Sequence, residues 1–323
     1  MEQIIYNLSN HQYHFGEEES QYISSTQLKW YEKSPKYYLH NKLYPKEDKN
    51  DNLRFGSCFH AYMEWLAKHP RIDKAGRFED SDEIVLFQPP INKNTGLPYG
   101  SATKAYKEAY AEFEGTNKDK IITTPMELLT ISGMANSMTK ECGEISQIIS
   151  KLLQWGKPEV SYFYENEDGI KMKIRPDLIT SNKVIDWKTT SLDDFSESSI
   201  NRVISQYGYD ISAAMYQWVL FQITHKYYTF YLVLVCKSEP YDCVIVDMSK
   251  WAYQYEEDDD ILIPNIGAQK FMDLLKQHTY CVKHNVWKGA ECKVSPNHQG
   301  LKIMRPTPPD YENWKRIDYF NED

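Results

Sequence analysis

The feature of this sequence that most constrains its fold is a change of hydrophobic period near residue 155. Before it, apolar residues recur at helical spacing, over residues 24–40, 55–69, 101–113 and 125–154. Residues 159–190 instead alternate apolar and polar side chains and contain turn signals at Asp168-Gly169 and Ser181-Asn182. This alternation predicts three antiparallel strands joined by tight turns.

Helix and strand signals continue to alternate downstream. Residues 200–224 return to helical spacing, and residues 226–237 and 241–249 predict two further strands. The first of these strands is apolar along almost its whole length, which is typical of a central strand. A helix is expected after Pro264, because proline is favoured in the first helical turn. This order of elements predicts an α/β fold preceded by a helical N-terminal part.

Composition excludes several classes of protein. The 323 residues carry a net charge of −9 and are 41% hydrophobic, which excludes a wholly disordered chain. We expect no membrane partner and a cytoplasmic location, because the sequence lacks both a run of about 18 apolar residues and the pattern of a signal peptide. The 6 cysteines form no C-x-x-C pair and are expected to be reduced. The acidic balance argues against a passive nucleic-acid coat protein, but it is compatible with an enzyme whose basic groove is local.

The strongest candidate for chemistry is the set Asp177, Asp186 and Lys188. On a strand, Asp186 and Lys188 lie on one face, because side chains alternate with a period of two. A tight hairpin at 180–183 would bring Asp177 beside Asp186. Two carboxylates and an amine suit a hard cation such as Mg²⁺, which lowers the pKa of a bound water, and Lys188 could position that water or offset phosphate charge. Phosphodiester hydrolysis needs these parts.

Each candidate also has a structural interpretation. A D-x-K tripeptide is common by chance, and a plain salt bridge between Asp186 and Lys188 would explain the pair without catalysis. His60, in a predicted helix, is either a structural histidine or an extra metal ligand that suits Mn²⁺ as well as Mg²⁺. Glu159, just before the first strand, is either an exposed strand-edge residue or a carboxylate that serves the metal site.

A second group of metal-binding residue types lies near the end of the chain: His278, Cys281, His284, Cys292 and His298. Their spacing fits no established zinc pattern, so zinc is not predicted. The acidic run at 256–260 is expected to be a solvated loop. The sequence contains no GxxxxGK[ST] loop, so an ATP-driven motor is not supported.

Several segments, taken in order, resemble a known family. They are FGSCFH, PEVSYFY, KIRPDLI, VIDWKTT and QYGYDISAAMYQWV. In this order they resemble the RecE-type (exonuclease VIII-like) phage recombination nucleases of the PD-(D/E)XK superfamily. SSTQLKWYEKSPKYYLH is similar to the opening helix of RecB-like nucleases, and residues 99–113 with the helix that follows are similar to the RecE-type insertion. The resemblance spans about residues 20 to 310.

The resemblance implies a restriction-endonuclease-like core, in which a mixed central sheet is flanked by helices. We expect this core at residues 155–280. A helical N-terminal part at 1–154 would contain the helix of His60 and the insertion, and residues 281–323 would form an irregular tail. The whole chain would be one continuous domain.

The same resemblance implies a role for each residue that matches a family motif. His60, Asp177 and Asp186 match the metal ligands, helped by the main-chain carbonyl of Trp187. Lys188 matches the catalytic lysine. These roles agree with the chemistry expected from the residues themselves.

The helix after the core is implied to bind DNA. Tyr207 and Tyr209 match the tyrosines of its YGY segment. Ser212 stands where the family commonly has a glutamine, and serine reaches less far, which puts the role of this helix in question. Lys29 and Lys104, with Lys33 and Lys36, are candidates to line a DNA channel; the alternative for each is an ordinary solvated lysine.

By resemblance, the activity is Mg²⁺-dependent 5′→3′ degradation of one strand of linear double-stranded DNA. The product, a 3′ single-stranded tail, would pass to a RecT-like single-strand annealing protein. A homo-oligomeric ring around DNA is also implied, and it suits an acidic chain because only the channel needs basic residues. Two alternatives stay open: a single-strand or structure-specific nuclease of the same fold, and a catalytically silent DNA-binding or assembly module in which the acidic residues and the lysine form a static ion-pair cluster.

Overall fold

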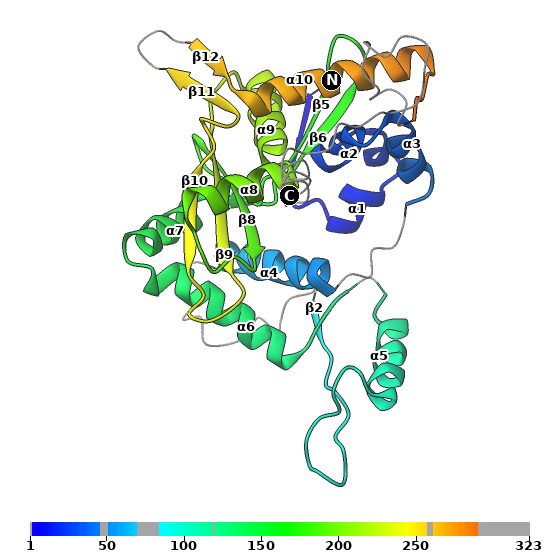
Figure 1. Ribbon diagram of the computed structural model, residues 1–323, viewed down its shortest axis with the longest axis vertical. Helices are drawn as coiled ribbons and strands as arrows, with labels where there is room; N and C mark the ends of the chain where they lie inside the picture. Colours follow the sequence, from blue (N-terminus) through cyan, green and yellow to red (C-terminus); the bar gives the residue numbers. More distant parts are fainter. Residues whose placement is uncertain (1, 46–50, 70–83, 119, 257–260, 290–323) are drawn as a thin grey trace, which may run out of the picture.

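The centre of the protein is a five-stranded mixed sheet (Figure 1). The computed structural model describes residues 2–45, 51–69, 84–118, 120–256 and 261–289. The sheet has the order β10-β9-β8-β7-β4, in which β8 and β9 run parallel and the other neighbours antiparallel. Its strands are β4 (Lys157–Pro158), β7 (Leu178–Ile179), β8 (Lys183–Thr190), β9 (Thr229–Cys236) and β10 (Cys243–Asp247). The predicted central position of the apolar strand, β9, is confirmed.

Three smaller sheets surround this centre. An antiparallel sheet of order β1-β5-β6 is built from β1 (Glu2–Ile5), β5 (Ser161–Glu165) and β6 (Lys171–Ile174). Strands β2 (Ile84–Leu86) and β3 (Ile121–Thr123) pair in parallel, and β11 (Tyr253–Glu256) and β12 (Ile261–Pro264) form a hairpin. The N-terminal part is therefore not purely helical, since it contributes β1 to a sheet with the strands of the core.

Cap residues mark the starts of several α-helices. Within the predicted helical segment 24–40, Ser24 and Ser34 each cap a helix by accepting from backbone N–H groups, and the helix expected after Pro264 begins at Ile266. The helices in chain order are α1 (Asn10–Phe15), α2 (Ser25–Lys29), α3 (Pro35–Leu43), α4 (Asp51–Lys68), α5 (Lys104–Thr116), α6 (Pro125–Asn136), α7 (Glu144–Trp155), α8 (Glu197–Tyr207), α9 (Tyr209–Thr224) and α10 (Ile266–His284). None of the described helices is long and apolar enough to span a membrane.

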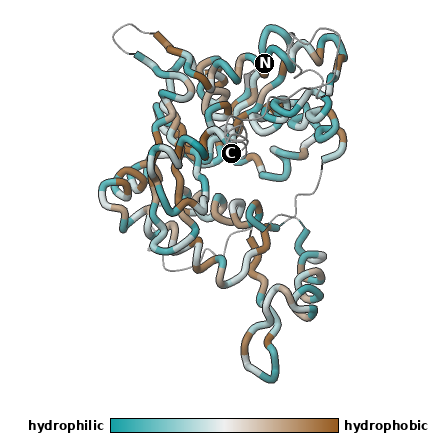
Figure 2. The backbone as a smooth tube through the Cα atoms, in the orientation of Figure 1, coloured by the Kyte–Doolittle hydropathy of each residue, from teal (hydrophilic) through white to brown (hydrophobic). Residues whose placement is uncertain are grey.

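Alternate residues of the central strands face two separate cores. On β8, Val184 packs into the core formed with α9 and α10, whereas Ile185 and Trp187 pack into the core formed with α4, α6 and α7. Hydrophobic and hydrophilic stretches accordingly alternate along the chain in Figure 2. Because both faces of the sheet are covered by packed side chains, we expect its strands to hold the side chains that they carry in fixed positions.

Four sequence predictions need correction. The helical segment at 200–224 is divided at Gly208 into α8 and α9. Residues 159–190 form four strands rather than three, because the chain leaves the β5-β6 sheet after Ile174 and enters the central sheet at Leu178. The helix expected over 125–154 is broken into α6 and α7 by a π-helical turn and by Gly143, whose φ of 57° favours glycine. Helix α10 continues to His284, beyond the expected start of the irregular tail.

Some predictions concern residues that the structure does not describe. In the predicted acidic loop, Glu256 ends β11 and residues 257–260 lie outside the described residues. The tail from residue 290 onwards does so as well. The proposed boundary between the N-terminal part and the core remains a prediction.

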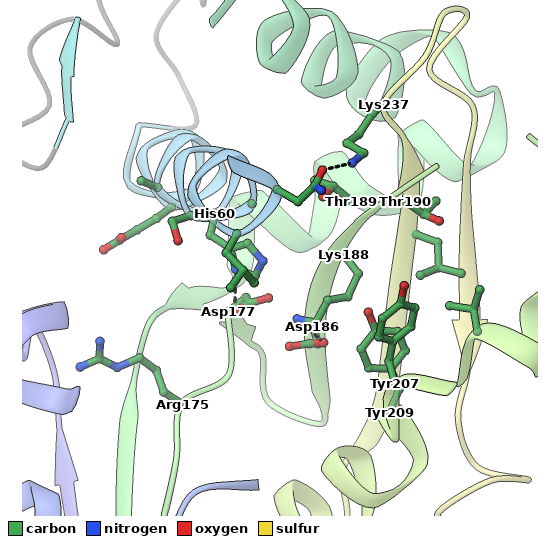
Figure 3. A pocket seen from close by; sticks show the side chains of 18 of the residues that line it. His60, Arg175, Asp177, Asp186, Lys188, Thr189, Thr190, Tyr207, Tyr209 and Lys237 are labelled. Atoms are coloured by element: carbon green, nitrogen blue, oxygen red, sulfur yellow. Dashed lines mark hydrogen bonds and ion pairs between the residues drawn. The ribbon is translucent and has the colours of Figure 1, made fainter. Parts of the chain in front are cut away.

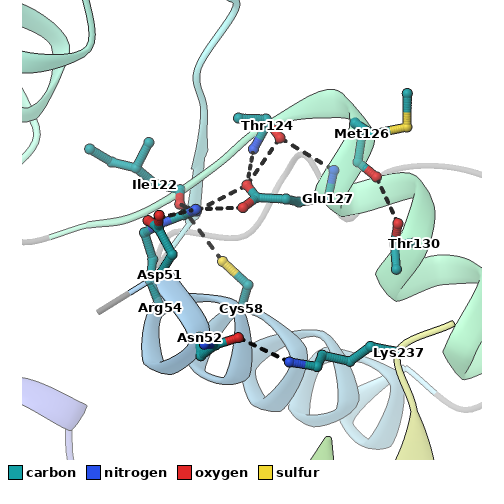
Figure 4. A network of polar contacts seen from close by, with 10 residues as sticks. All are labelled: Asp51, Asn52, Arg54, Cys58, Ile122, Thr124, Met126, Glu127, Thr130 and Lys237. Atoms are coloured by element: carbon teal, nitrogen blue, oxygen red, sulfur yellow. Dashed lines mark hydrogen bonds and ion pairs between the residues drawn. The ribbon is translucent and has the colours of Figure 1, made fainter. Parts of the chain in front are cut away.

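A charged network fastens β3 and α6 to α4 (Figure 4). The Arg54 guanidinium donates to the Ile122 carbonyl at 2.7 Å and makes two bonds to the Glu127 carboxylate, one of them 3.0 Å long. Glu127 also accepts from the backbone N–H and the hydroxyl of Thr124 in a capping box. Burial opposes ionisation of Glu127, but Arg54 and Thr124 outweigh it and lower the pKa of this carboxyl.

We predict that Glu127→Gln lowers the free energy of unfolding by about 2 kcal/mol at neutral pH, because a half-buried charged pair is lost. The loss should shrink as the pH falls through the lowered pKa of Glu127, since the wild-type carboxyl then becomes neutral too. Urea unfolding at several pH values measures this, with exposed Glu108→Gln as the control. An equal loss at pH 7 and at low pH would contradict the ion-pair explanation.

Candidate active site

The β7–β8 hairpin places the two candidate aspartates opposite each other. Leu178 pairs with Ile185 and Ile179 with Val184, so the register, continued by one residue, sets Asp177 across from Asp186. The predicted tight turn is present, with Thr180 N–H bonded to the Lys183 carbonyl at 2.9 Å. One oxygen of Asp177, Oδ2, accepts from the Trp187 backbone N–H at 2.6 Å. The backbone itself therefore holds this carboxylate in place.

Asp186 and Lys188 share one face of β8, as strand alternation predicts (Figure 3). The Lys188 ammonium lies 2.7 Å from Asp186 Oδ2 and donates to the Trp187 carbonyl at 3.1 Å. The ion pair that the structural interpretation requires is thus present. Both side chains nevertheless line a large cavity rather than being enclosed in the core.

His60 and Glu159 complete the cluster from two other parts of the chain. His60 Nδ1, on α4, lies 3.1 Å from Asp177 Oδ1. Glu159 sits between β4 and β5 with a φ of 51°, and its carboxylate lies 3.8 Å from Arg175 Nε. One possible ligand atom from each of His60, Glu159 and Asp177 lies within 4.8 Å of the other two. Segments more than a hundred residues apart in the sequence therefore meet at Asp177.

The electrostatics of the cluster reflect two carboxylates in a confined space. Burial, reinforced by the charge of Asp177, raises the pKa of Asp186 despite the neighbouring Lys188. Burial also opposes ionisation of Asp177, but His60, Lys188 and the Trp187 N–H together lower the pKa of its carboxyl. Although burial disfavours its charge, Lys188 has a raised pKa because both aspartates are close, so it is an ammonium at neutral pH.

The donor set fits a divalent cation. Carboxylate oxygens are the preferred ligands of Mg²⁺, and the addition of an imidazole also suits Mn²⁺. His60, Glu159 and Asp177 offer such atoms within one small volume, and Asp186 lies across the hairpin from Asp177. A positive ion in this place would stabilise the ionised form of Asp186, which burial and the charge of Asp177 disfavour.

The cluster opens into a cavity of about 1070 Å³ (Figure 3). One wall comes from the N-terminal segment, through Leu8, Asn10, Tyr13 and His14. Arg175 fixes this wall by donating to the Leu8 carbonyl at 2.9 Å and to Ser161 Oγ at 2.8 Å. The opposite wall comes from β8 and from the turn between α8 and α9. The cavity is thus a feature of the whole fold rather than of one motif.

The proposed DNA-contact residues are spread over different places. Tyr207 and Tyr209 line the cavity, with ring centroids 5.6 Å apart. Ser212 accepts from the Lys29 ammonium at 3.1 Å, so these two residues lie together beside the turn that carries the tyrosines. Lys104 begins α5, where its side chain is 87% exposed and lies 3.6 Å from Glu108. The structure therefore groups Lys29, Ser212 and the tyrosines, but not Lys104.

Three basic residues that line the cavity were not predicted as site residues: Arg175, Arg202 and Lys237. Arg175 precedes the Pro-Asp of KIRPDLI, which was a signal available in the sequence. Arg202 lies on α8, and Lys237 follows β9 and donates to Asn52 Oδ1 at 3.0 Å. Nothing in the local sequence of Arg202 or Lys237 distinguishes them from solvated surface residues, because only the fold brings these two residues to the cavity.

The second group of metal-binding residue types does not assemble among the residues that the structure describes. His278 is buried, with Nδ1 2.8 Å from the Tyr31 hydroxyl, and its ring packs edge-on against Tyr38. Burial lowers the pKa of His278 to about 4, so it is a neutral core histidine at pH 7. Cys281 is buried as well, whereas Cys292 and His298 lie outside the described residues.

We predict that Asp177→Asn weakens Mn²⁺ binding by at least about 10-fold, because it removes a ligand charge while keeping an acceptor for the Trp187 N–H. Electron paramagnetic resonance of free Mn²⁺ measures the dissociation constant. The control is Asp273→Asn, which changes an 80% exposed aspartate on α10. Equal affinities for Asp177→Asn and wild type would remove Asp177 from the metal site.

Comparisons with known proteins show the family and the fold of this chain. No curated protein matches the chain. The crystal structure named "Putative exonuclease", from Eubacterium rectale, has a TM-score of 0.52 and 14% sequence identity, and the match covers 95% of this chain and 98% of that one. At this identity the likeness shows the fold alone. The family described as "PDDEXK-like domain of unknown function (DUF3799)" matches residues 24–292, so the chain belongs to this PDDEXK-like family.

Proposed function

We propose that this protein is a metal-dependent 5′→3′ exodeoxyribonuclease that acts on linear double-stranded DNA. The observation that carries the proposal is the convergence of Asp177, Asp186 and Lys188 with His60 at one wall of a large cavity. Membership of a PDDEXK-like family and the fold shared with the Eubacterium rectale protein support a nuclease. The sequence resemblance to RecE-type nucleases supports the finer assignment.

The proposed metal site uses Asp177, Asp186, His60 and the main-chain carbonyl of Trp187, with the Glu159 carboxylate close by. When bound there, Mg²⁺ or Mn²⁺ would lower the pKa of a water and stabilise charge on a phosphate. The carbonyl of Trp187 accepts from Lys188, so the lysine and this ligand are already adjacent.

Lys188 has the clearest role among the protein groups. As an ammonium, it can orient the attacking water and offset negative charge that develops on the scissile phosphate. Asp186 holds this ammonium at the cavity surface. His60 and the Trp187 N–H fix the two oxygens of Asp177, which keeps that carboxylate in one orientation.

The DNA would enter the same cavity. Tyr207 is 54% exposed and, with Tyr209, offers aromatic faces for bases. Arg202 and Lys237 line the cavity and suit contacts to phosphates. Lys104, the exposed first residue of α5, is a further candidate for a phosphate contact outside the cavity. A homo-oligomeric ring and a RecT-like annealing partner complete the proposal on the basis of the sequence resemblance.

The nearest competing function is a single-strand or structure-specific nuclease with the same site. The stacked tyrosines favour it, because stacking on aromatic rings is a common way to bind unpaired bases. A catalytically silent module is disfavoured, because Asp186 and Lys188 line a cavity instead of being enclosed as a structural ion pair.

We predict that the protein with Mg²⁺ shortens a linear duplex from its 5′ ends, so that a 5′ label is released at once while a 3′ label stays on progressively shorter strands. Duplexes labelled at either end, with free or blocked 5′ termini, and a matched single strand distinguish the substrates on sequencing gels. Asp186→Asn should abolish cleavage, whereas Asp273→Asn should not. Preferential cleavage of the single strand would replace the proposed substrate, and full activity of Asp186→Asn would end the nuclease assignment at this site.

We predict that Lys188→Met lowers the cleavage rate roughly 100-fold or more, because one preorganised cation at the reacting phosphate is lost. Mn²⁺ affinity should remain within a few-fold of wild type, since the carboxylates and His60 stay in place. Single-turnover cleavage and metal titration separate the two effects. If Lys188→Met cleaves as fast as wild type, the lysine has no part in the chemistry.

A further inference from the structure

A second lysine contacts the turn that carries the tyrosines of the candidate active site. Lys29 is the last residue of α2, and its ammonium donates to the Tyr207 carbonyl at 3.1 Å and to Ser212 Oγ at 3.1 Å. Ser212 in turn donates to Ser25 Oγ at 3.3 Å. One amine therefore ties α2 to the end of α8 and the start of α9.

The backbone of this turn is fitted to the lysine stem. Gly208 has a φ of 62°, which favours glycine, and a Cβ at this position would lie 2.7 Å from Lys29 Cδ. The Tyr207 carbonyl belongs to the last turn of α8, where carbonyls lack helical partners and carry partial negative charge. An ammonium is a suitable donor for such a group.

The turn so held presents both tyrosines to the cavity. Tyr207 and Tyr209 flank Gly208, stack on each other and line the cavity. The Tyr209 ring centroid lies 6.0 Å from the Lys188 ammonium. Lys29 thus bonds to the residue just before Gly208. The residue just after Gly208 is Tyr209, whose ring lies beside Lys188.

We propose that Lys29 is a positioning residue, whose ammonium fixes the α8–α9 turn so that Tyr207 and Tyr209 hold a nucleic-acid substrate beside Lys188. The inference rests on the proposed function for its substrate, but its structural part can be tested without catalysis. It gives Lys29 a role different from that of a lysine that lines a DNA channel.

The charge of Lys29 makes this role dependent on pH. Burial, reinforced by the charge of Lys188, lowers the pKa of Lys29 to about 8, against the opposing charges of Asp186, Glu32 and Asp210. The ammonium is therefore present below about pH 8 and is lost as the pH rises through that value. The contribution of Lys29 to substrate binding should fade over the same range.

The structural test uses fluorine NMR on full-length protein labelled with 3-fluorotyrosine. Tyr207→Phe and Tyr209→Phe assign the two signals. Lys29→Met removes the ammonium donor and Ser212→Ala removes one of its acceptors, so each variant should shift or broaden both tyrosine signals. Lys29→Arg keeps a charged donor, so its tyrosine signals should lie closer to those of wild type. The control is Lys151→Met, at an exposed position on α7. Unchanged tyrosine signals in Lys29→Met, with wild-type folding by circular dichroism, would overturn the proposal.

The functional test is a double-mutant cycle on cleavage of linear duplex with Mg²⁺. Lys29→Met should raise the KM for DNA about 10-fold at pH 7 with little change in kcat, and its difference from wild type should shrink above pH 8. In a Tyr207→Ala, Tyr209→Ala background the effect should vanish, because the lysine acts through the tyrosines. Full additivity would overturn the proposal. If the tyrosine signals respond but wild type cleaves no DNA, the proposed function fails and the positioning role stands.

Discussion

Two carboxylates held opposite each other by the β7–β8 hairpin of a covered sheet are the constraint on which the rest of the structure depends. The β7–β8 register places Asp177 and Asp186 together, and their repulsion in a low-dielectric setting has to be offset. Lys188 approaches Asp186, while His60 and the Trp187 N–H approach Asp177. A divalent cation would also supply positive charge beside the two carboxylates. The stability of the fold and the proposed chemistry therefore both need positive charge at this site.

The groups that meet this demand come from far apart in the chain. Helix α4 supplies His60, and the network around Arg54 fastens β3 and α6 to the start of that helix. The N-terminal segment forms a wall of the cavity and is fixed by Arg175. Lys29, from α2, bonds to the turn that carries Tyr207 and Tyr209. The N-terminal part therefore builds the site together with the core.

This arrangement also explains how an acidic chain can suit a polyanionic substrate. The net charge is −9, yet Lys188, Arg175, Arg202 and Lys237 all line one cavity. Because charges separated by more than about 8–10 Å of solvent are screened at physiological salt, the local potential matters more to a bound phosphate than the overall balance. The acidic surface elsewhere would then discourage nonspecific binding.

The sequence by itself determined the parts of this protein that depend on neighbouring residues: the strand alternation of β8, the hairpin before it, the helix after Pro264, and the place of β9 inside the sheet. Only the tertiary structure decided what depends on distant contacts. The transfer of the chain between two sheets near Pro176, the approach of His60 to Asp177, and the arrival of Arg202, Lys237 and Lys29 at the site carry no local signal. The reason is physical: period and capping are set within one turn or strand, whereas these contacts exist only once both faces of the sheet are packed.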